Sequence, residues 1–151
     1  MPKENSLSDY INKSNKITKV FDRKIRISLL SSFTINGLSE ILKVKSAERN
    51  ISCTVYEAPY NQYSQEILNK KSDLYKFLPD MTFLIIDARN IFGEIFRFPY
   101  SISHLERAKI VENKINELKN LLDNYIENSN SKIIVTKLNI PSFSPNGIFE
   151  S

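Results

Sequence analysis

Short apolar runs that alternate with helical patterns predict an alternating order of strands and helices in this chain. The first run, residues 27–30, is too short for a helix and is bounded by polar residues, as in a strand buried within a sheet. Residues 51–57 alternate and are rich in β-branched side chains. Residues 82–86 are the most apolar run and the best candidate for a central strand, and residues 133–135 form the fourth strand.

Apolar residues at helical spacing predict the connections between these strands. A helix is expected after the first strand from about residue 38, with Asn36 as its N-cap, and short helical segments over residues 64–69 and 72–77, the latter capped by Ser72. The longest helix is expected from about Ile102 to Glu127, after an aromatic loop over residues 91–101. Its apolar stripe is predicted to pack in the core and consists of Leu105, Ala108, Val111, Ile115, Leu118, Leu122 and Tyr125.

The order β-α-β-α-β-α-β, with connections long enough for right-handed crossovers, predicts the fold class. We expect a three-layer α/β/α sandwich with a mostly parallel sheet, flavodoxin-like. If the strand order is 2-1-3-4, the order reverses between the first and third strands. Residues 1–23 are expected to form a lead-in or a short helix that packs on the domain, and residues 24–151 the α/β domain itself.

Polar residues follow the predicted strands where a ligand crevice is expected. In such sheets ligands bind outside the carboxyl ends of the strands where the strand order reverses, here between the first and third strands. The residues predicted to line this crevice are Ser31, Ser32, Thr34, Asn36, Tyr60, Asn61, Gln62, Asp87, Arg89 and Asn90, with Asn139 and Ser142 closing one side. The hydroxyls bind an anion or an oxyanion, or they only cap the turn. Asp87 and Arg89 form an acid with an anion clamp, or a structural cap and its ion pair.

The charge of the chain bears on its partners. Hydrophobic residues make up 41% and charged residues 25%, which is ordinary for a globular domain, but the net charge is +4. A basic face could steer a nucleic acid or an acidic protein, or it could be an ordinary solvated surface. No RNA-binding or DNA-binding motif is present, which argues against a nucleic-acid partner. The early basic residues are Lys13, Lys16, Lys19, Arg23, Lys24 and Arg26.

Familiar catalytic and metal-binding patterns are weak in this sequence. His104 is the only histidine and is predicted to lie on the surface or to cap the long helix. Cys53 is the only cysteine, fits a reducing compartment, and is predicted to be a small buried side chain. No His/Cys cluster has metal-ligand spacing, and no glycine-rich phosphate motif occurs. The chain has no long apolar run and no secretory signal, so we expect a cytoplasmic protein and no membrane partner.

Particular segments of the chain resemble a known family. They are Leu-Leu-Ser-Ser-Phe-Thr-Ile-Asn-Gly-Leu (29–38), Tyr-Asn-Gln-Tyr-Ser-Gln-Glu-Ile-Leu (60–68), Phe-Leu-Ile-Ile-Asp-Ala-Arg (83–89) and Leu-Asn-Ile-Pro-Ser-Phe-Ser-Pro-Asn-Gly (138–147). Together they resemble the N-terminal domain of FkbH-like proteins, which belong to the haloacid dehalogenase (HAD) superfamily, subfamily IIIC. The resemblance spans about residues 24–148, and its second segment is the most specific.

The resemblance implies a domain similar to SGNH (GDSL-type) hydrolases that precedes a phosphatase-like HAD domain. Such proteins load a glyceryl group from a phosphorylated donor onto the thiol of an acyl carrier protein. The HAD Asp-x-Asp motif is absent from this chain, so Mg²⁺ is expected only in the HAD domain and no cofactor in this one. The expected partners are the adjoining HAD domain and an acyl carrier protein.

The chain departs from active SGNH enzymes at each motif. The position of their Gly-Asp-Ser is occupied by Ser31-Ser32-Phe33, so Ser32 is the candidate nucleophile only after a one-residue shift. Arg89 replaces the oxyanion-hole Asn, and the C-terminal Asp-x-x-His is absent. The resemblance therefore predicts a non-hydrolytic binding or helper domain. The alternatives are an active esterase or acyltransferase using Ser32, and a pure interaction or oligomerisation domain that uses the aromatic loop.

Overall fold

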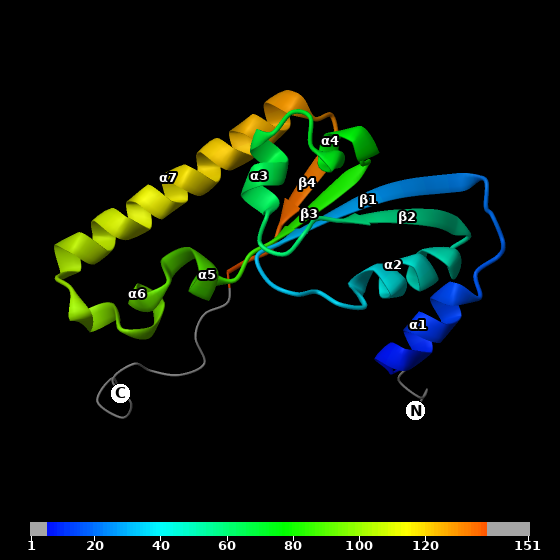
Figure 1. Cartoon of the computed structure of the whole chain (residues 1–151), viewed down its shortest axis with the longest axis horizontal. Helices are drawn as coiled ribbons and strands as arrows, with labels where there is room; N and C mark the ends of the chain where they lie inside the picture. The colour runs from blue at the N-terminus through cyan, green and yellow to red at the C-terminus, as the bar shows by residue number, and fades with distance from the viewer. Residues whose placement is uncertain (1–5, 139–151) are drawn as a thin grey trace.

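The computed structural model describes residues 6–138 and contains strands and helices in the predicted order (Figure 1). The strands are β1 (Arg23–Ser31), β2 (Ile51–Glu57), β3 (Met81–Ile85) and β4 (Lys132–Val135). The helices are α1 (Leu7–Asn15), α2 (Leu38–Ala47), α3 (Tyr63–Leu68), α4 (Asp73–Phe77), α5 (Ala88–Phe92), α6 (Glu94–Arg97), the 3₁₀ helix η1 (Pro99–Ser101) and α7 (His104–Asn128).

The described strands form one parallel sheet in the order β2-β1-β3-β4. Leu29 of β1 pairs with Phe83 of β3, which in turn pairs with Ile134 of β4. This order is the beginning of the flavodoxin-like arrangement, and the strand order reverses between β1 and β3. The predicted fold class is therefore confirmed, and the strand order is the one considered from the sequence.

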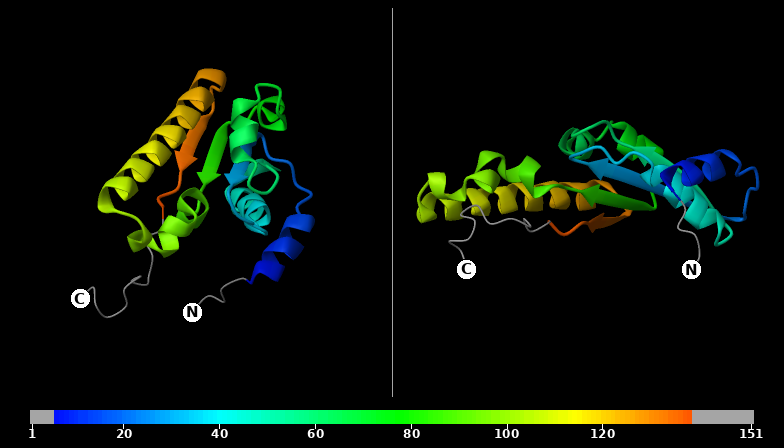
Figure 2. Two further views of the ribbon diagram at one scale, coloured as in Figure 1. Left: turned by 60° about the vertical axis from the view of Figure 1, so that its left-hand side comes forward. Right: turned by 90° about the horizontal axis from the view of Figure 1, so that it is seen from below.

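Helices cover the two faces of the sheet, as the direction of each crossover requires (Figure 2). The chain moves from β1 to β2 in one direction along the sheet, and from β2 to β3 and from β3 to β4 in the opposite direction. Right-handed crossovers therefore place α2 on one face and α3, α4 and α7 on the other. Helix α1 packs on α2 in the outer layer, and α3 packs on α7.

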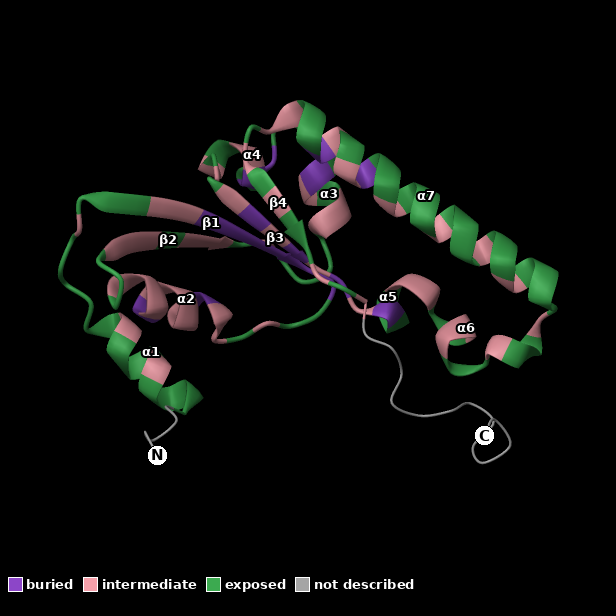
Figure 3. Ribbon diagram, turned by 180° about the vertical axis from the view of Figure 1, so that it is seen from behind, coloured by how far each residue is buried: buried purple, intermediate pink, exposed green. Residues whose placement is uncertain are grey.

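The larger core cluster lies between the sheet and the α3–α7 layer (Figure 3). Leu30 of β1 and Leu84 of β3 are paired in the sheet, so their side chains point to the same face. They form the side of the cluster that belongs to the sheet. Ile67 of α3 and Tyr125 of α7 cover them, and all of these side chains are fully buried. The cluster fixes the carboxyl end of α7 to the sheet.

A chain of hydroxyl groups runs through this core. The Ser28 and Thr82 hydroxyls lie 2.5 Å apart, and Thr82 is also 2.5 Å from the Tyr125 hydroxyl, which in turn contacts Ser131. Ser28, Thr82 and Tyr125 are fully buried. Each of these four hydroxyls therefore has a hydrogen-bond partner within the protein, as buried polar groups require.

The N-cap of α2 is not the residue that the sequence predicted. The prediction that Asn36 is the N-cap is wrong, because Gly37 occupies that position with a φ of +86° and no side-chain cap. A left-handed φ favours glycine. A Cβ atom at Gly37 would also lie 2.2 Å from the Cδ1 atom of Leu7 in α1. Gly37 therefore permits both the turn into α2 and the close approach of α1.

The apolar stripe of α7 is only partly in the core, which corrects its prediction. Tyr125 of the stripe is buried, whereas Leu105 is 80% exposed and Ile115 is 58% exposed. Leu121 is also buried, although the predicted stripe did not include it. The amino-terminal half of α7 extends past the carboxyl ends of the strands, where no sheet lies beneath it (Figure 3). The preceding residues, predicted as a loop, fold into α6 and η1.

Candidate functional site

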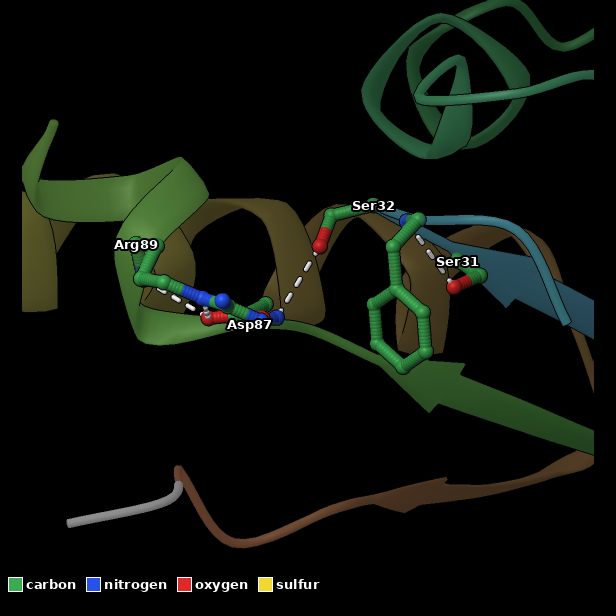
Figure 4. Close-up of polar contacts among 5 residues, drawn as sticks. Ser31, Ser32, Asp87 and Arg89 are labelled. Carbon is green, nitrogen blue, oxygen red and sulfur yellow. Dashed lines mark hydrogen bonds and ion pairs between the residues drawn. The ribbon is translucent and has the colours of Figure 1, made fainter. Parts of the chain in front are cut away.

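The serines at the carboxyl end of β1 make local hydrogen bonds (Figure 4). The Ser31 hydroxyl accepts a hydrogen bond from the backbone N–H of Phe33 at 3.1 Å. The Ser32 hydroxyl accepts one from the backbone N–H of Asp87 at 2.9 Å, and Ser32 N–H donates to the Ile85 carbonyl at 3.1 Å. Ser32 is fully buried, so its hydroxyl joins the ends of β1 and β3 and does not face solvent.

Asp87 and Arg89 form a tight pair at the end of β3. Asp87 is the N-cap of α5 and accepts a hydrogen bond from the Arg89 backbone N–H at 2.8 Å. The Arg89 guanidinium bonds the same carboxylate through Nε at 3.0 Å and Nη2 at 2.5 Å. The hydrogen bonds from Arg89 lower the pKa of Asp87 below its ordinary value. Of the two interpretations in the sequence, this geometry matches the structural cap with its ion pair.

The loop after β2 lies over the end of β1, as the crevice prediction requires. The Asn61 backbone N–H donates to the Ser31 carbonyl at 3.2 Å, and Asn61 adopts a left-handed φ of +55°. Tyr60 and Gln62, in the same loop, are exposed. Thr34 and Asn36 are also exposed, and their side chains make no hydrogen bond to residues 6–138.

His104 does not approach Ser32. It is the first residue of α7, is exposed, and follows the N-cap Ser103, whose hydroxyl accepts from the Glu106 backbone N–H. This end of α7 is the one that projects away from the sheet (Figure 1). The surface position predicted for His104 is confirmed. Within the described residues the Ser32 hydroxyl makes no hydrogen bond to a His, Asp or Glu side chain, and Asn139 and Ser142 lie outside the described residues.

A cavity of about 520 Å³ opens beside the predicted crevice, between α3, α5 and α7. Of the predicted crevice residues, Asn90 alone lines it. The other lining residues could not be predicted from the sequence, because they come together only where α3 packs against α7. No local sequence pattern encodes that contact. The lining residues are Tyr63, Ser64, Leu68, Asn90, Ile91, Lys114, Glu117, Leu118, Asn120, Leu121 and Asn124.

The basic residues and the cysteine that were considered for binding or catalysis lie outside this region. The early basic residues of β1, such as Arg23 and Lys24, start the strand and so lie at the end of the sheet opposite the crevice. Cys53 is half-buried, and burial raises the pKa of its thiol. Within residues 6–138, no three His, Cys, Asp or Glu side chains gather to hold a metal ion. None of the helices in that part of the chain is long and apolar enough to span a membrane.

Comparison with solved structures supports the fold. The chain aligns with a crystal structure described as the N-terminal part of the protein BF1531 from Bacteroides fragilis, containing a phosphatase domain complexed with Mg, at a TM-score of 0.71 and 19% identity. The alignment covers 92% of this chain and 35% of that one, so the chain spans about a third of its length. At this identity the likeness shows the fold alone. No curated protein sequence matches this chain.

The family is shown by a direct sequence match. The family described as "FkbH, N-terminal domain" matches residues 26–146. The match spans β1 to β4, with the serine turn, the Asp87–Arg89 pair and the cavity residues within it. The chain therefore belongs to the FkbH N-terminal domain family.

Proposed function

We propose that this chain is a non-hydrolytic binding or helper domain of an FkbH-like protein. In this role it assists the transfer of a glyceryl or acyl group to an acyl carrier protein in a biosynthetic pathway. The chemistry belongs to an adjoining phosphatase-like HAD domain, and this domain contributes binding at the carboxyl edge of its sheet. Its SGNH-like shape is then a scaffold for that binding.

The burial and the hydrogen bonding of the Ser32 hydroxyl are the main support for this proposal. A serine nucleophile needs an open hydroxyl and a base within hydrogen-bond reach. Here the hydroxyl is fully buried and accepts the Asp87 N–H, and the nearby Asp87 carboxylate is engaged by Arg89. Because nucleophile and base act as a unit, a serine held in this way has little hydrolytic power.

The proposed partners follow from the family and from the length of its relatives. The matched crystal structure contains a phosphatase domain, and this chain aligns with about a third of that protein. In the proposed arrangement Mg²⁺ belongs to the HAD domain. The described residues of this domain contain no group of three His, Cys, Asp or Glu side chains that could hold the ion.

An active-site fluorophosphonate probe tests the proposal. We expect no labelling of the intact chain, and no ester hydrolysis above that of Ser32→Ala. That variant should instead lose about 1–2 kcal/mol in the free energy of unfolding, because the Asp87 N–H loses its acceptor. Labelling of the wild-type chain that disappears in Ser32→Ala would restore the esterase interpretation. Binding of a matched carrier protein, measured by calorimetry, tests the partner separately.

One observation favours the alternative function of an interaction domain. The amino-terminal half of α7 exposes Leu105 and Ile115, and nearby Phe98 is 63% exposed. If this surface associates with a second copy, sedimentation should show a dimer that dissociates in Leu105→Lys. A monomer at every concentration of wild-type protein would remove this alternative.

A further inference from the structure

We propose that a cleft at the amino-terminal edge of the sheet binds a small organic phosphate. The cleft lies between α2, the start of β2 and the segment that connects α1 to β1, which runs past the carboxyl end of α2 (Figure 1). Its volume of about 210 Å³ is below the range of about 300–1,000 Å³ for drug-sized ligands, so it accepts a phosphate group with only a few carbon atoms. The cleft is at the opposite end of the strands from the crevice residues, so this site goes beyond the proposed function.

The side chains that line the cleft include two cations and no carboxylate. The cations are Lys19 and Lys43. The Lys19 ammonium lies 5.0 Å from the centre of the Phe21 ring, which also lines the cleft. Burial raises the pKa of the Cys53 thiol, and a hydrogen bond with Ser46 and the charge of Lys43 oppose that shift. The Lys43 ammonium therefore lies near a thiol that lines the same cleft.

These two positive charges are not neutralised by the protein. Within residues 6–138 no ion pair joins Lys19 or Lys43 to a carboxylate, whereas Lys45, on the same helix as Lys43, pairs with Glu48 at 3.0 Å. A phosphate group carries close to two negative charges at neutral pH and so balances both lysines, whereas a carboxylate balances one. Lysine is also a common ligand of phosphate. Lys16, exposed beside the cleft, adds to the potential that attracts an anion.

Hydrogen bonds between the two walls hold the cleft in shape. The Phe21 backbone N–H donates to the Ser52 hydroxyl at 2.7 Å, and that hydroxyl donates to the Phe21 carbonyl at 3.3 Å. These bonds attach the segment after α1 to β2, and so they bring Lys19 to the cleft. Apart from Ile17 and Lys19, the lining residues are half-buried. Ile17 and Ile51 give the lining an apolar part that suits the few carbon atoms of the ligand.

The alkylation of Cys53 tests the inference, because this residue is the only cysteine of the chain and lines the cleft. Iodoacetate, an anion, and iodoacetamide, which is neutral, alkylate the same thiol, and mass spectrometry follows both reactions. We expect the rate ratio of iodoacetate to iodoacetamide to exceed that of the neutral thiol N-acetylcysteine amide by about fivefold, because the lysines attract the anion. Inorganic phosphate and ethyl phosphate should slow both reactions of Cys53 by occupying the cleft.

Charge-removing variants show whether the cleft itself is responsible. Lys43→Gln should bring the rate ratio close to that of the free thiol. It should also weaken binding of inorganic phosphate about tenfold, measured by the amide NMR shifts of residues 17–21 and 43–53. Lys109→Gln is the matched control, because it removes the same charge from an exposed position on α7 outside the cleft. This control should change phosphate binding less than about twofold.

Two results would overturn the inference: a rate ratio equal to that of the free thiol, or equal phosphate affinity for wild type and Lys43→Gln. The first is expected if the lysines serve only the carboxyl ends of α1 and α2, where helix dipoles favour cations. Ethyl phosphate should bind at least as tightly as inorganic phosphate, and binding of inorganic phosphate alone would exclude an organic ligand. The fluorophosphonate test of Ser32 concerns the opposite end of the sheet, so neither experiment decides the outcome of the other.

Discussion

Replacing Tyr125 with alanine is expected to lower the free energy of unfolding by about 4 kcal/mol, as large aromatic truncations in cores do. The Tyr125 ring is fully buried and stacks on Tyr75 with a centroid distance of 6.2 Å. Its hydroxyl bonds Thr82 and contacts Ser131. The substitution therefore leaves a cavity under α7 and removes a partner from buried hydroxyls. Urea unfolding followed by circular dichroism measures the loss.

Two further variants separate the ring from its hydroxyl. Tyr125→Phe keeps the packing and removes only the hydroxyl, so it should cost about 1–2 kcal/mol. Ile126→Ala changes the neighbouring position, which is 62% exposed, and should cost less than about 0.5 kcal/mol. A loss for Tyr125→Ala no larger than that for Ile126→Ala would show that α7 is not anchored through this residue.

The sheet could be predicted from the sequence because its signals are local. Strand β2 begins and ends at the predicted residues, and the apolar run at residues 82–86 lies within one residue of β3. A short buried strand needs little more than an apolar run with polar ends. The right-handed crossover rule then sets the face on which each helix lies once the strand order is known.

Features that depend on packing between distant segments could not be predicted. The stripe of α7 has the same spacing in both halves, but only the half above the sheet packs in or against the core. Leu105, which is exposed, has no local signal to distinguish it from Leu118, which packs against the core. The cap of α2 depended on the approach of Leu7 to Gly37. The Ser72 hydroxyl occupies the predicted cap position of α4 but donates to the Glu66 carbonyl at 2.7 Å.

The hydrogen-bond partners of the predicted crevice residues could not be predicted from the sequence either. Sequence order placed Ser32 and Asp87 at neighbouring strand ends, and the structure joins them by a hydrogen bond. Whether such groups bind a ligand or each other depends on where their donors point, and hydroxyl and carboxylate groups do both equally well. The cavity beside them is lined mostly by α7 residues, and of these only Leu118 belongs to the apolar stripe that the sequence predicted.

Glu66→Ala is expected to cost about 2–3 kcal/mol, a large loss for one side chain at an accessible position. One carboxylate oxygen of Glu66 accepts hydrogen bonds from the Tyr56 hydroxyl and the Leu74 backbone N–H, both at 3.0 Å. Leu74 is fully buried in the first turn of α4. Removing the carboxylate therefore leaves a buried donor without a partner. Glu112→Ala, on α7, is the control and should be close to neutral, because Glu112 is exposed and its side chain makes no hydrogen bond to the described residues. Equal losses for the two variants would contradict this role for Glu66.

The Tyr56–Glu66 contact also makes stability depend on pH. Burial, and then the hydrogen bond to Glu66, raise the pKa of Tyr56 above its ordinary value. The unfolded chain ionises this tyrosine near its ordinary value of about 10, while the folded chain keeps it protonated. The contribution of Tyr56 to the free energy of unfolding should therefore be constant below about pH 10 and fall as the pH rises above it. Tyr56→Phe removes this contribution, so its stability should fall less steeply over the same range. Identical slopes for wild type and Tyr56→Phe would show that Tyr56 ionises equally easily in both states, and that the contact with Glu66 does not hold it neutral.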